Sequence, residues 1–202
     1  MQAATMDALP GFLLAAVALA GSPGPATLGL TATGAAFGAR RGLLYLAGIV
    51  LGMALVMAIV ASGVVGLMLA IPGVTPVIGG LAALYFLHLA WRIATAPPLS
   101  EASAAGRAPG LAAGLLLSLV NPKGYAAMAA LYSGFVLDRH HVLLDVAFKT
   151  ALLVVVMIAV NLAWLLAGAS LSRAFRDPRR GRRLNLAFAG LLLASVAVAL
   201  WP

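Results

Sequence analysis

The chain has 202 residues, of which 63% are hydrophobic and only 9% are charged, and its formal net charge is +8. Soluble domains average about half apolar and a quarter charged residues, so this composition excludes a soluble globular protein. It indicates an all-α integral membrane protein. The chain contains no cysteine, which excludes disulfides, thiolate metal sites and dithiol redox chemistry. The basic residues lie between apolar runs, which favours a role in membrane topology over nucleic-acid binding.

Six apolar stretches are long enough to cross a bilayer, which takes about 20 helical residues. They cover residues 8–39, 42–70, 76–95, 110–136, 142–171 and 184–201. Arg40, Arg41 and Gly42 are expected to form a short basic turn after the first of them. The sequence thus predicts six transmembrane helices.

Residues 96–109 have the composition of a linker, rich in Pro, Ser, Ala and Gly. We expect one transmembrane domain, 1–202, with halves 1–95 and 110–202 on either side of this linker. Lys and Arg gather in the first, third and fifth loops, which places these loops in the cytoplasm and both termini outside. The two three-helix halves then have opposite orientations, which is the arrangement of an inverted repeat.

Helix-breaking segments lie at corresponding places in the first and fourth predicted helices, at 21–25 and 121–124. A proline has no N–H and frees the carbonyl four residues earlier, so Pro25 frees that of Gly21. In hydrocarbon, free backbone groups are tolerated only where they are buried in protein or line a wet cavity. We therefore interpret the two breaks as one inward-facing transport site. The alternative is that the prolines only kink the helices for packing.

A broken helix offers two kinds of binding group. The new N-terminus attracts an anion such as a carboxylate, and the freed carbonyls attract a cation such as an ammonium. A zwitterionic amino acid carries both charges. The residues predicted to bind substrate are Pro23, Gly24, Pro25, Thr27, Ser118, Asn121, Pro122, Lys123, Tyr125 and Asn161.

Helical spacing places Ser118, Asn121 and Tyr125 on one face of the fourth helix, together with Met128 and Tyr132. A polar face across a membrane suits a substrate pathway, while hydrogen bonding between helices is the alternative. Thr27 and Asn161 carry the same two interpretations, since a hydroxyl or amide can also bond within its own helix or to a neighbour.

Lys123 is expected to be the most deeply placed charge in the chain, and a charge at membrane depth is a functional hypothesis by default. The alternative is a side chain that reaches toward the lipid headgroups. No acidic residue is expected deep in a span, since Asp145 lies near the start of its helix. Proton coupling would then depend on Lys123, on His88, or on an acidic residue near a helix end such as Asp145.

Glycines four residues apart occur at Gly34, Gly38 and Gly42, and again at Gly48 and Gly52. Such spacing permits close helix approach, for which packing inside the fold is the first interpretation and a homodimer seam the second. The sequence offers no metal site, no cofactor motif and no grouping of nucleophile, base and acid. It therefore does not predict an enzyme.

The motifs resemble those of the LysE/RhtB family of bacterial amino-acid exporters over almost the whole length. The matching segments are Ser22–Pro25, Gly38–Gly42, Leu84–Tyr85 with Trp91–Arg92, Asn121–Lys123, and Arg182–Asn185. The resemblance implies a multi-pass protein of the bacterial inner membrane that exports an amino acid or a related metabolite, driven by the proton motive force. The chain departs from the family pattern at Ala26–Thr27, where asparagines are usual, and at Met53, where an acidic residue is usual.

The expected partners are a small amino-acid-like substrate and the lipid bilayer. Two other functions remain open at this point. One is export of another solute such as a metal cation. The absence of cysteine argues against this, and so does the expected absence of buried acidic residues, because hard cations prefer oxygen ligands. The other is a membrane scaffold or assembly protein without transport, in which both breaks are purely structural.

Overall fold

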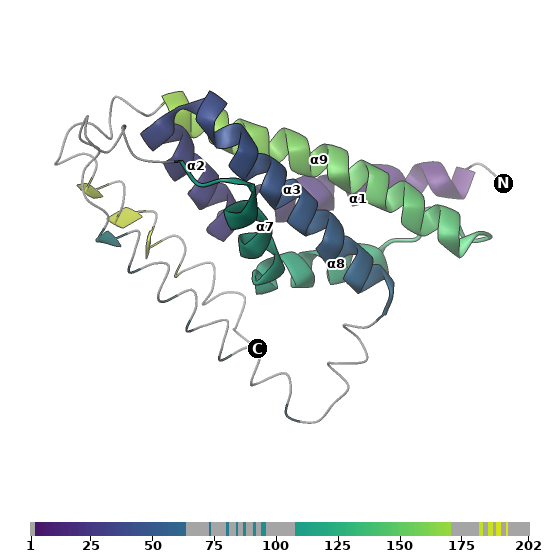
Figure 1. The fold of residues 1–202 in the computed structure, drawn as a ribbon. Coiled ribbons are helices and arrows are strands. Elements are labelled where there is room, and N and C mark those ends of the chain that lie inside the picture. Colours follow the sequence, from purple (N-terminus) through teal and green to yellow (C-terminus); the bar gives the residue numbers. More distant parts are fainter. Residues whose placement is uncertain are drawn as a thin grey trace.

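A computed structural model describes residues 3–63 and 108–170 continuously, with single residues between 73 and 95 and between 182 and 193. The continuous ranges form six helices. These are α1 (Ala3–Gly21), α2 (Pro25–Phe37), α3 (Ala39–Ala61), α7 (Leu111–Leu119), α8 (Pro122–Gly134) and α9 (Val142–Ser170). Figure 1 shows α3 and α9 as long rods, with the shorter helices arranged against them.

The predicted first and fourth helices are each broken in two, as expected from their prolines. The first consists of α1 and α2, and the fourth of α7 and α8. The predicted fifth helix is α9 with almost the expected bounds. The expected third and sixth helices and the linker 96–109 lie largely outside the described residues.

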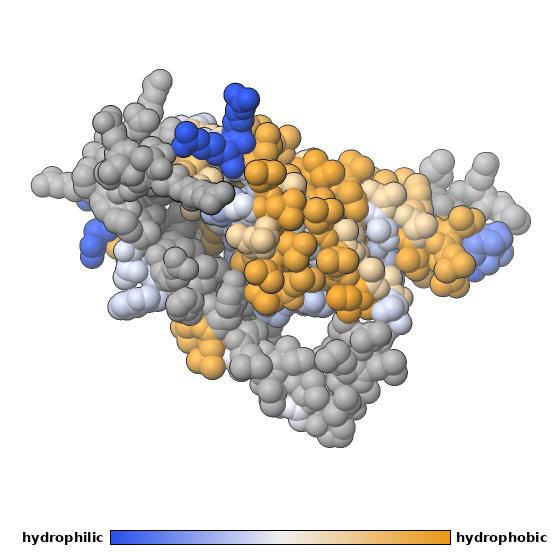
Figure 2. Space-filling model, in the orientation of Figure 1, coloured by the Kyte–Doolittle hydropathy of each residue, from blue (hydrophilic) through white to orange (hydrophobic). Residues whose placement is uncertain are grey.

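Two of the described helices, α3 and α9, are long and apolar enough to cross a membrane by themselves. The segments Ala8–Gly21 and Pro25–Phe37 together form a third candidate span, bent by 59° at the break. Large apolar side chains such as Leu143, Val155 and Leu166 are exposed on α9. Figure 2 shows a broad hydrophobic face over the helix bundle. In water such a surface would be unfavourable, so it is the surface that faces lipid.

Two boundary predictions were wrong. The basic turn expected at 40–42 is helical, because α3 begins at Ala39. The chain turns instead at Gly38, whose φ of 79° is a conformation that only glycine adopts easily. The helix expected over 42–70 also ends early, at Ala61, where the adjoining Gly63 again has a positive φ of 76°.

Close contacts between helices depend on glycine, as the spacing predicted. A methyl group on Gly48 would collide with the Leu111 backbone of α7, and one on Gly114 would collide with the Tyr45 backbone of α3. Gly34 lies in the same way against the backbone of α9. These glycines therefore serve packing inside the fold, with α3 against α7 and α2 against α9.

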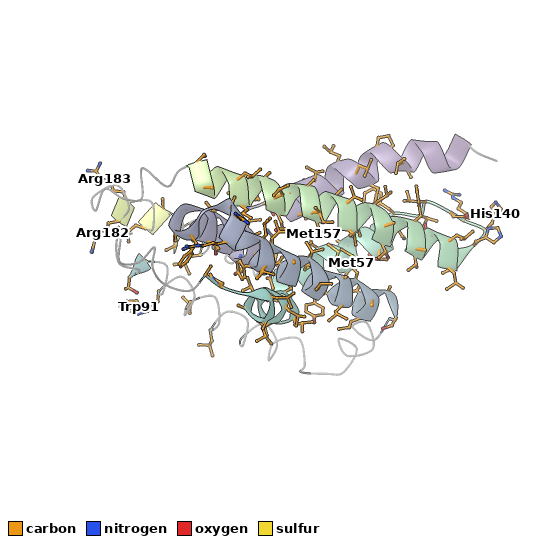
Figure 3. All side chains as sticks on the ribbon, turned by 45° about the horizontal axis from the view of Figure 1, so that its top comes forward. Met57, Trp91, His140, Met157, Arg182 and Arg183 are labelled. Atoms are coloured by element: carbon orange, nitrogen blue, oxygen red, sulfur yellow. The ribbon has the colours of Figure 1, made fainter. Side chains whose placement is uncertain are left out.

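Buried apolar side chains from all six described helices form the core. Fully buried apolar side chains include Ile49 and Met57 of α3, Leu131 of α8 and Leu153 of α9. Figure 3 shows Met57 and Met157 in the middle of the bundle, where α3 and α9 pass each other. The two breaks open beside this core, which is the feature that positions the site.

Candidate functional site

The break in the first helix exposes backbone groups, and other parts of the chain satisfy them. The freed carbonyl of Leu19 accepts a hydrogen bond from the Ser22 hydroxyl at 2.9 Å. The freed carbonyl of Gly21 accepts one from the Trp164 indole of α9 at 3.2 Å. On the other side of the break, the Gly24 N–H donates to the Thr27 hydroxyl at 2.9 Å, and this hydroxyl donates back to the Gly24 carbonyl at 3.1 Å. The bend is thus held by specific hydrogen bonds.

The break in the fourth helix is shorter and less well satisfied. The N–H of Asn121 donates to the Ser118 carbonyl at 3.2 Å, and α8 then starts at Pro122. Asn121 is the N-cap residue of α8, yet its side chain makes no capping bond. Its Oδ1 is buried and has no hydrogen-bond partner within the described part of the chain. Such groups are rare in folded proteins, and each one calls for an explanation.

Lys123 joins the two breaks. Its ammonium donates to the carbonyl of Ser22 at 2.6 Å and to that of Pro23 at 3.2 Å. The lysine of the second break therefore binds the carbonyl side of the first. The sequence predicted that these carbonyls attract a cation, and in this structure the cation is a side chain of the protein itself.

A cavity of about 40 Å³ lies between the breaks, bounded by residues of α1, α2, α3, α8 and α9. Six of the ten predicted site residues line it. They are Gly24, Pro25, Thr27, Asn121, Lys123 and Asn161. The structure thus brings together residues from the first, fourth and fifth predicted helices around one space.

Four predicted site residues do not line this cavity: Pro23, Ser118, Pro122 and Tyr125. Pro23 and Pro122 lie in the breaks themselves and shape the backbone. Ser118 is fully buried, and its hydroxyl donates to the Ile49 carbonyl of α3 at 3.0 Å. That bond is the interhelical alternative that the sequence left open for this residue.

Sequence reasoning missed the apolar part of the lining. The thioether side chains of Met53, Met128 and Met157 border the cavity together with Ile49. The helical spacing places Met128 on the polar face of its helix, and this was the available signal. Met53 and Met157 lie in apolar helices where methionine is ordinary core, so no pattern set them apart.

A second lysine, Lys149 of α9, is buried more completely than the sequence indicated, since it is only 2% exposed. The Lys149 ammonium lies 2.6 Å from the carboxylate of Asp145, one helical turn earlier. It also donates to the carbonyls of Tyr132 and Phe135, at 3.1 and 2.9 Å. The pair connects α9 to the end of α8, away from the cavity, and the periodicity of α9 alone could not show its burial.

Comparison with known proteins gives the same family as the sequence motifs. The family model described as "LysE type translocator" matches residues 17–201. A "Cysteine/O-acetylserine efflux protein" of Salmonella typhimurium is 33% identical over 180 residues, covering 89% of this chain and 90% of the relative. The protein of the same description from Escherichia coli K12 is 31% identical over 180 residues, with the same coverage.

No solved structure matches the chain. The family match spans most of the sequence and includes both breaks. The relatives are transporters, so the prediction of a membrane carrier without enzymatic activity is confirmed. The chain belongs to the LysE type translocator family and is a multi-pass membrane transporter.

Proposed function

We propose that this protein exports a small neutral amino acid, cysteine or O-acetylserine, from a binding site between the two breaks. The observation that carries the proposal is the shared cavity, which both breaks border. The N-terminus of α8 with Lys123 offers positive charge for a carboxylate. The carbonyls of Ser22 and Pro23 offer acceptors for an ammonium.

The chemistry of the lining favours an uncharged side chain. Lys123 is the charged residue of the lining, and no carboxylate borders the cavity in the part of the chain that the structure describes. A basic amino acid would therefore bring a second positive charge without a partner, which is costly in a low-dielectric site. The methionines supply soft, adaptable surface that suits a short thiol or ester side chain.

The cavity is small in this structure. Its volume of about 40 Å³ compares with about 150 Å³ for a cavity that holds benzene. A substrate of amino-acid size therefore requires the breaks to move apart. We take this structure as a closed state of an alternating-access cycle, in which opening admits the substrate to Asn121, Thr27 and Asn161.

We also propose six transmembrane helices in two inverted repeats, 1–95 and 110–202, with both termini outside and the chain in the bacterial inner membrane. Helix contacts support the repeat. Both parts of the broken first helix pack on α9, and both parts of the broken fourth helix pack on α3. An inverted repeat requires this reciprocal arrangement, because its axis exchanges the first helix with the fourth and α3 with α9.

Transport into inside-out membrane vesicles tests the function. Vesicles that contain the protein should accumulate labelled cysteine or O-acetylserine when a proton gradient is imposed. This accumulation should stop when an ionophore dissipates the gradient. Labelled lysine and a divalent metal cation serve as controls and should not accumulate. Absence of uptake across a panel of neutral amino acids would refute the carrier proposal, and uptake that ignores the gradient would refute proton coupling alone.

A further inference from the structure

The Lys123 ammonium occupies the acceptors that a substrate ammonium would use. It lies 2.6 Å from the Ser22 carbonyl and 3.2 Å from the Pro23 carbonyl, both in the break of the first helix. We propose that Lys123 is a built-in occupant of the ammonium site, which substrate exchanges for its own ammonium while Lys123 turns to the substrate carboxylate. This inference rests on the proposed function and adds an order of events to it.

The second buried lysine shows by contrast what is unusual about Lys123. Lys149 also donates to two backbone carbonyls, but the carboxylate of Asp145 lies 2.6 Å from it. Its charge is therefore neutralised within the protein. Lys123 has carbonyl partners only, within the described residues, and it lines the cavity. A partly buried ammonium without a counter-ion is a favourable partner for an incoming carboxylate.

The path of the Lys123 side chain is also consistent with an occupant that can leave. A methyl group on Gly24 would lie 3.0 Å from the Lys123 Nζ and 3.1 Å from its Cδ, so the side chain passes directly over this glycine. Lysine has a long and flexible side chain with three rotatable donors, which can change partners without backbone movement. The three heavy atoms nearest to such a methyl group all belong to the Lys123 side chain, and none is a backbone atom of another helix.

The unpartnered Oδ1 of Asn121 adds an independent observation. Asn121 is 5% exposed and borders the same cavity, and its Oδ1 lacks a donor in the described structure. A second ammonium in the site would supply that donor. Asn121 Oδ1 is thus an acceptor on the cavity that a substrate ammonium can use in addition to the two carbonyls that Lys123 fills.

The exchange predicts that only a ligand with both charges displaces Lys123 efficiently. An amine alone would displace the lysine without offering it a new partner. A carboxylate alone would attract the lysine but leave the two carbonyls without a donor, which is costly in a buried site. The zwitterion satisfies every group, so its affinity should exceed that of either half.

Calorimetric titration of purified protein tests this with cysteine, cysteamine and 3-mercaptopropionate, on wild type and Lys123→Met. In wild type, cysteamine should bind about tenfold more weakly than cysteine, given the strength of charge-assisted hydrogen bonds. In Lys123→Met the ammonium site is empty, so cysteamine affinity should rise about tenfold. Binding of 3-mercaptopropionate should be lost in the variant. Unchanged or weaker cysteamine binding in Lys123→Met would overturn the proposal.

Two further variants keep the test interpretable. Arg139→Met removes a positive charge from the exposed turn before α9, so it controls for net charge and should leave cysteamine affinity unchanged. Lys123→Gln retains a donor for the carbonyls without the charge, and should give an intermediate cysteamine affinity if Lys123→Met fails to fold. A wild type that binds neither cysteine nor O-acetylserine would refute the proposed substrate. The gain in cysteamine affinity reports on the ammonium site alone.

Discussion

The two breaks differ in how completely the protein satisfies them. In the first helix, Ser22, Trp164, Thr27 and Lys123 supply partners for the exposed backbone on both sides of the bend. In the fourth helix, the cap residue Asn121 makes no capping bond and has a buried oxygen without a partner in the described structure. Both segments break a helix with proline, yet only the first has hydrogen-bond partners for its exposed backbone groups on both sides of the break.

This difference indicates which groups hold the backbone in place and which groups are available to bind substrate. A fully satisfied polar network rigidifies a structure, whereas an unsatisfied buried group costs stability unless another state or a ligand satisfies it. The first break therefore presents a fixed geometry that holds a cation. The second break carries the groups that change partners, Asn121 and Lys123. Substitutions that remove these hydrogen-bonding groups should therefore affect transport at the second break and stability at the first.

The largest expected effect is the loss of transport in Asn121→Leu. The variant removes a buried acceptor that has no partner among the described residues, and leaving such an acceptor unpaired costs wild type about 1–3 kcal/mol. Thermal unfolding of the purified variant should therefore occur at the same or a higher temperature than in wild type. Transport should fall by about 10–100-fold, because the substrate ammonium loses a charge-assisted hydrogen bond.

Vesicle uptake and thermal unfolding must be measured on the same preparation of Asn121→Leu. Normal uptake would show that the unpartnered oxygen has no role in binding. A strongly lowered unfolding temperature would show that Asn121 is a structural cap after all, and the contrast between the breaks would disappear.

At the first break, Thr27→Val should lower stability. The Thr27 hydroxyl is a partner of both the N–H and the carbonyl of Gly24, and valine has nearly the same shape. The buried Gly24 N–H would lose its acceptor, at a cost of about 1–3 kcal/mol. Thr33→Val is the matched control, because within the described residues the Thr33 hydroxyl donates to the Gly29 carbonyl of its own helix and accepts no backbone N–H. Equal unfolding temperatures for the two variants would contradict the role of Thr27.

The contact between Lys123 and Gly24 can be measured by a double-mutant cycle. Gly24→Ala should cost about 1 kcal/mol, at the low end for overpacking, because a flexible side chain gives way. In a Lys123→Ala background the same substitution should be neutral or slightly stabilising, since alanine restricts the unfolded chain. The difference between the two backgrounds, from thermal unfolding, is the coupling energy. Identical effects in both backgrounds would show that the lysine does not lie over Gly24.

The sequence predicted where the site lies better than how its groups are paired. Proline, asparagine and glycine mark the breaks locally, because each acts on the backbone of its own segment. The bond between Lys123 and the Ser22 carbonyl joins positions about a hundred residues apart, and no local pattern encodes it. The same holds for the burial of Lys149, which depends on the chain after α8 folding back over it.

Helix ends were predicted less well than helix centres. Gly38 and Gly63 end their helices by adopting positive φ values, whereas Arg40 and Ala61 fit either side of a boundary. The methionines of the cavity were missed for another reason. A thioether in an apolar helix looks like core from the sequence, and only the arrangement of α3, α8 and α9 brings Met53, Met128 and Met157 to one space.

The smallest expected effect concerns Trp164→Phe, which removes the indole donor to the Gly21 carbonyl. This bond is 3.2 Å long, and the ring itself stays, so the loss should be about 0.5–1.5 kcal/mol of stability. Trp164 does not border the cavity, and affinity for cysteine should therefore change less than twofold by calorimetry. A large loss of affinity with normal stability would mean that the bend of the first helix, and not only its carbonyls, sets the binding geometry. The first break would then take part in the cycle as a moving element, and its satisfied hydrogen bonds would be those of one state among several.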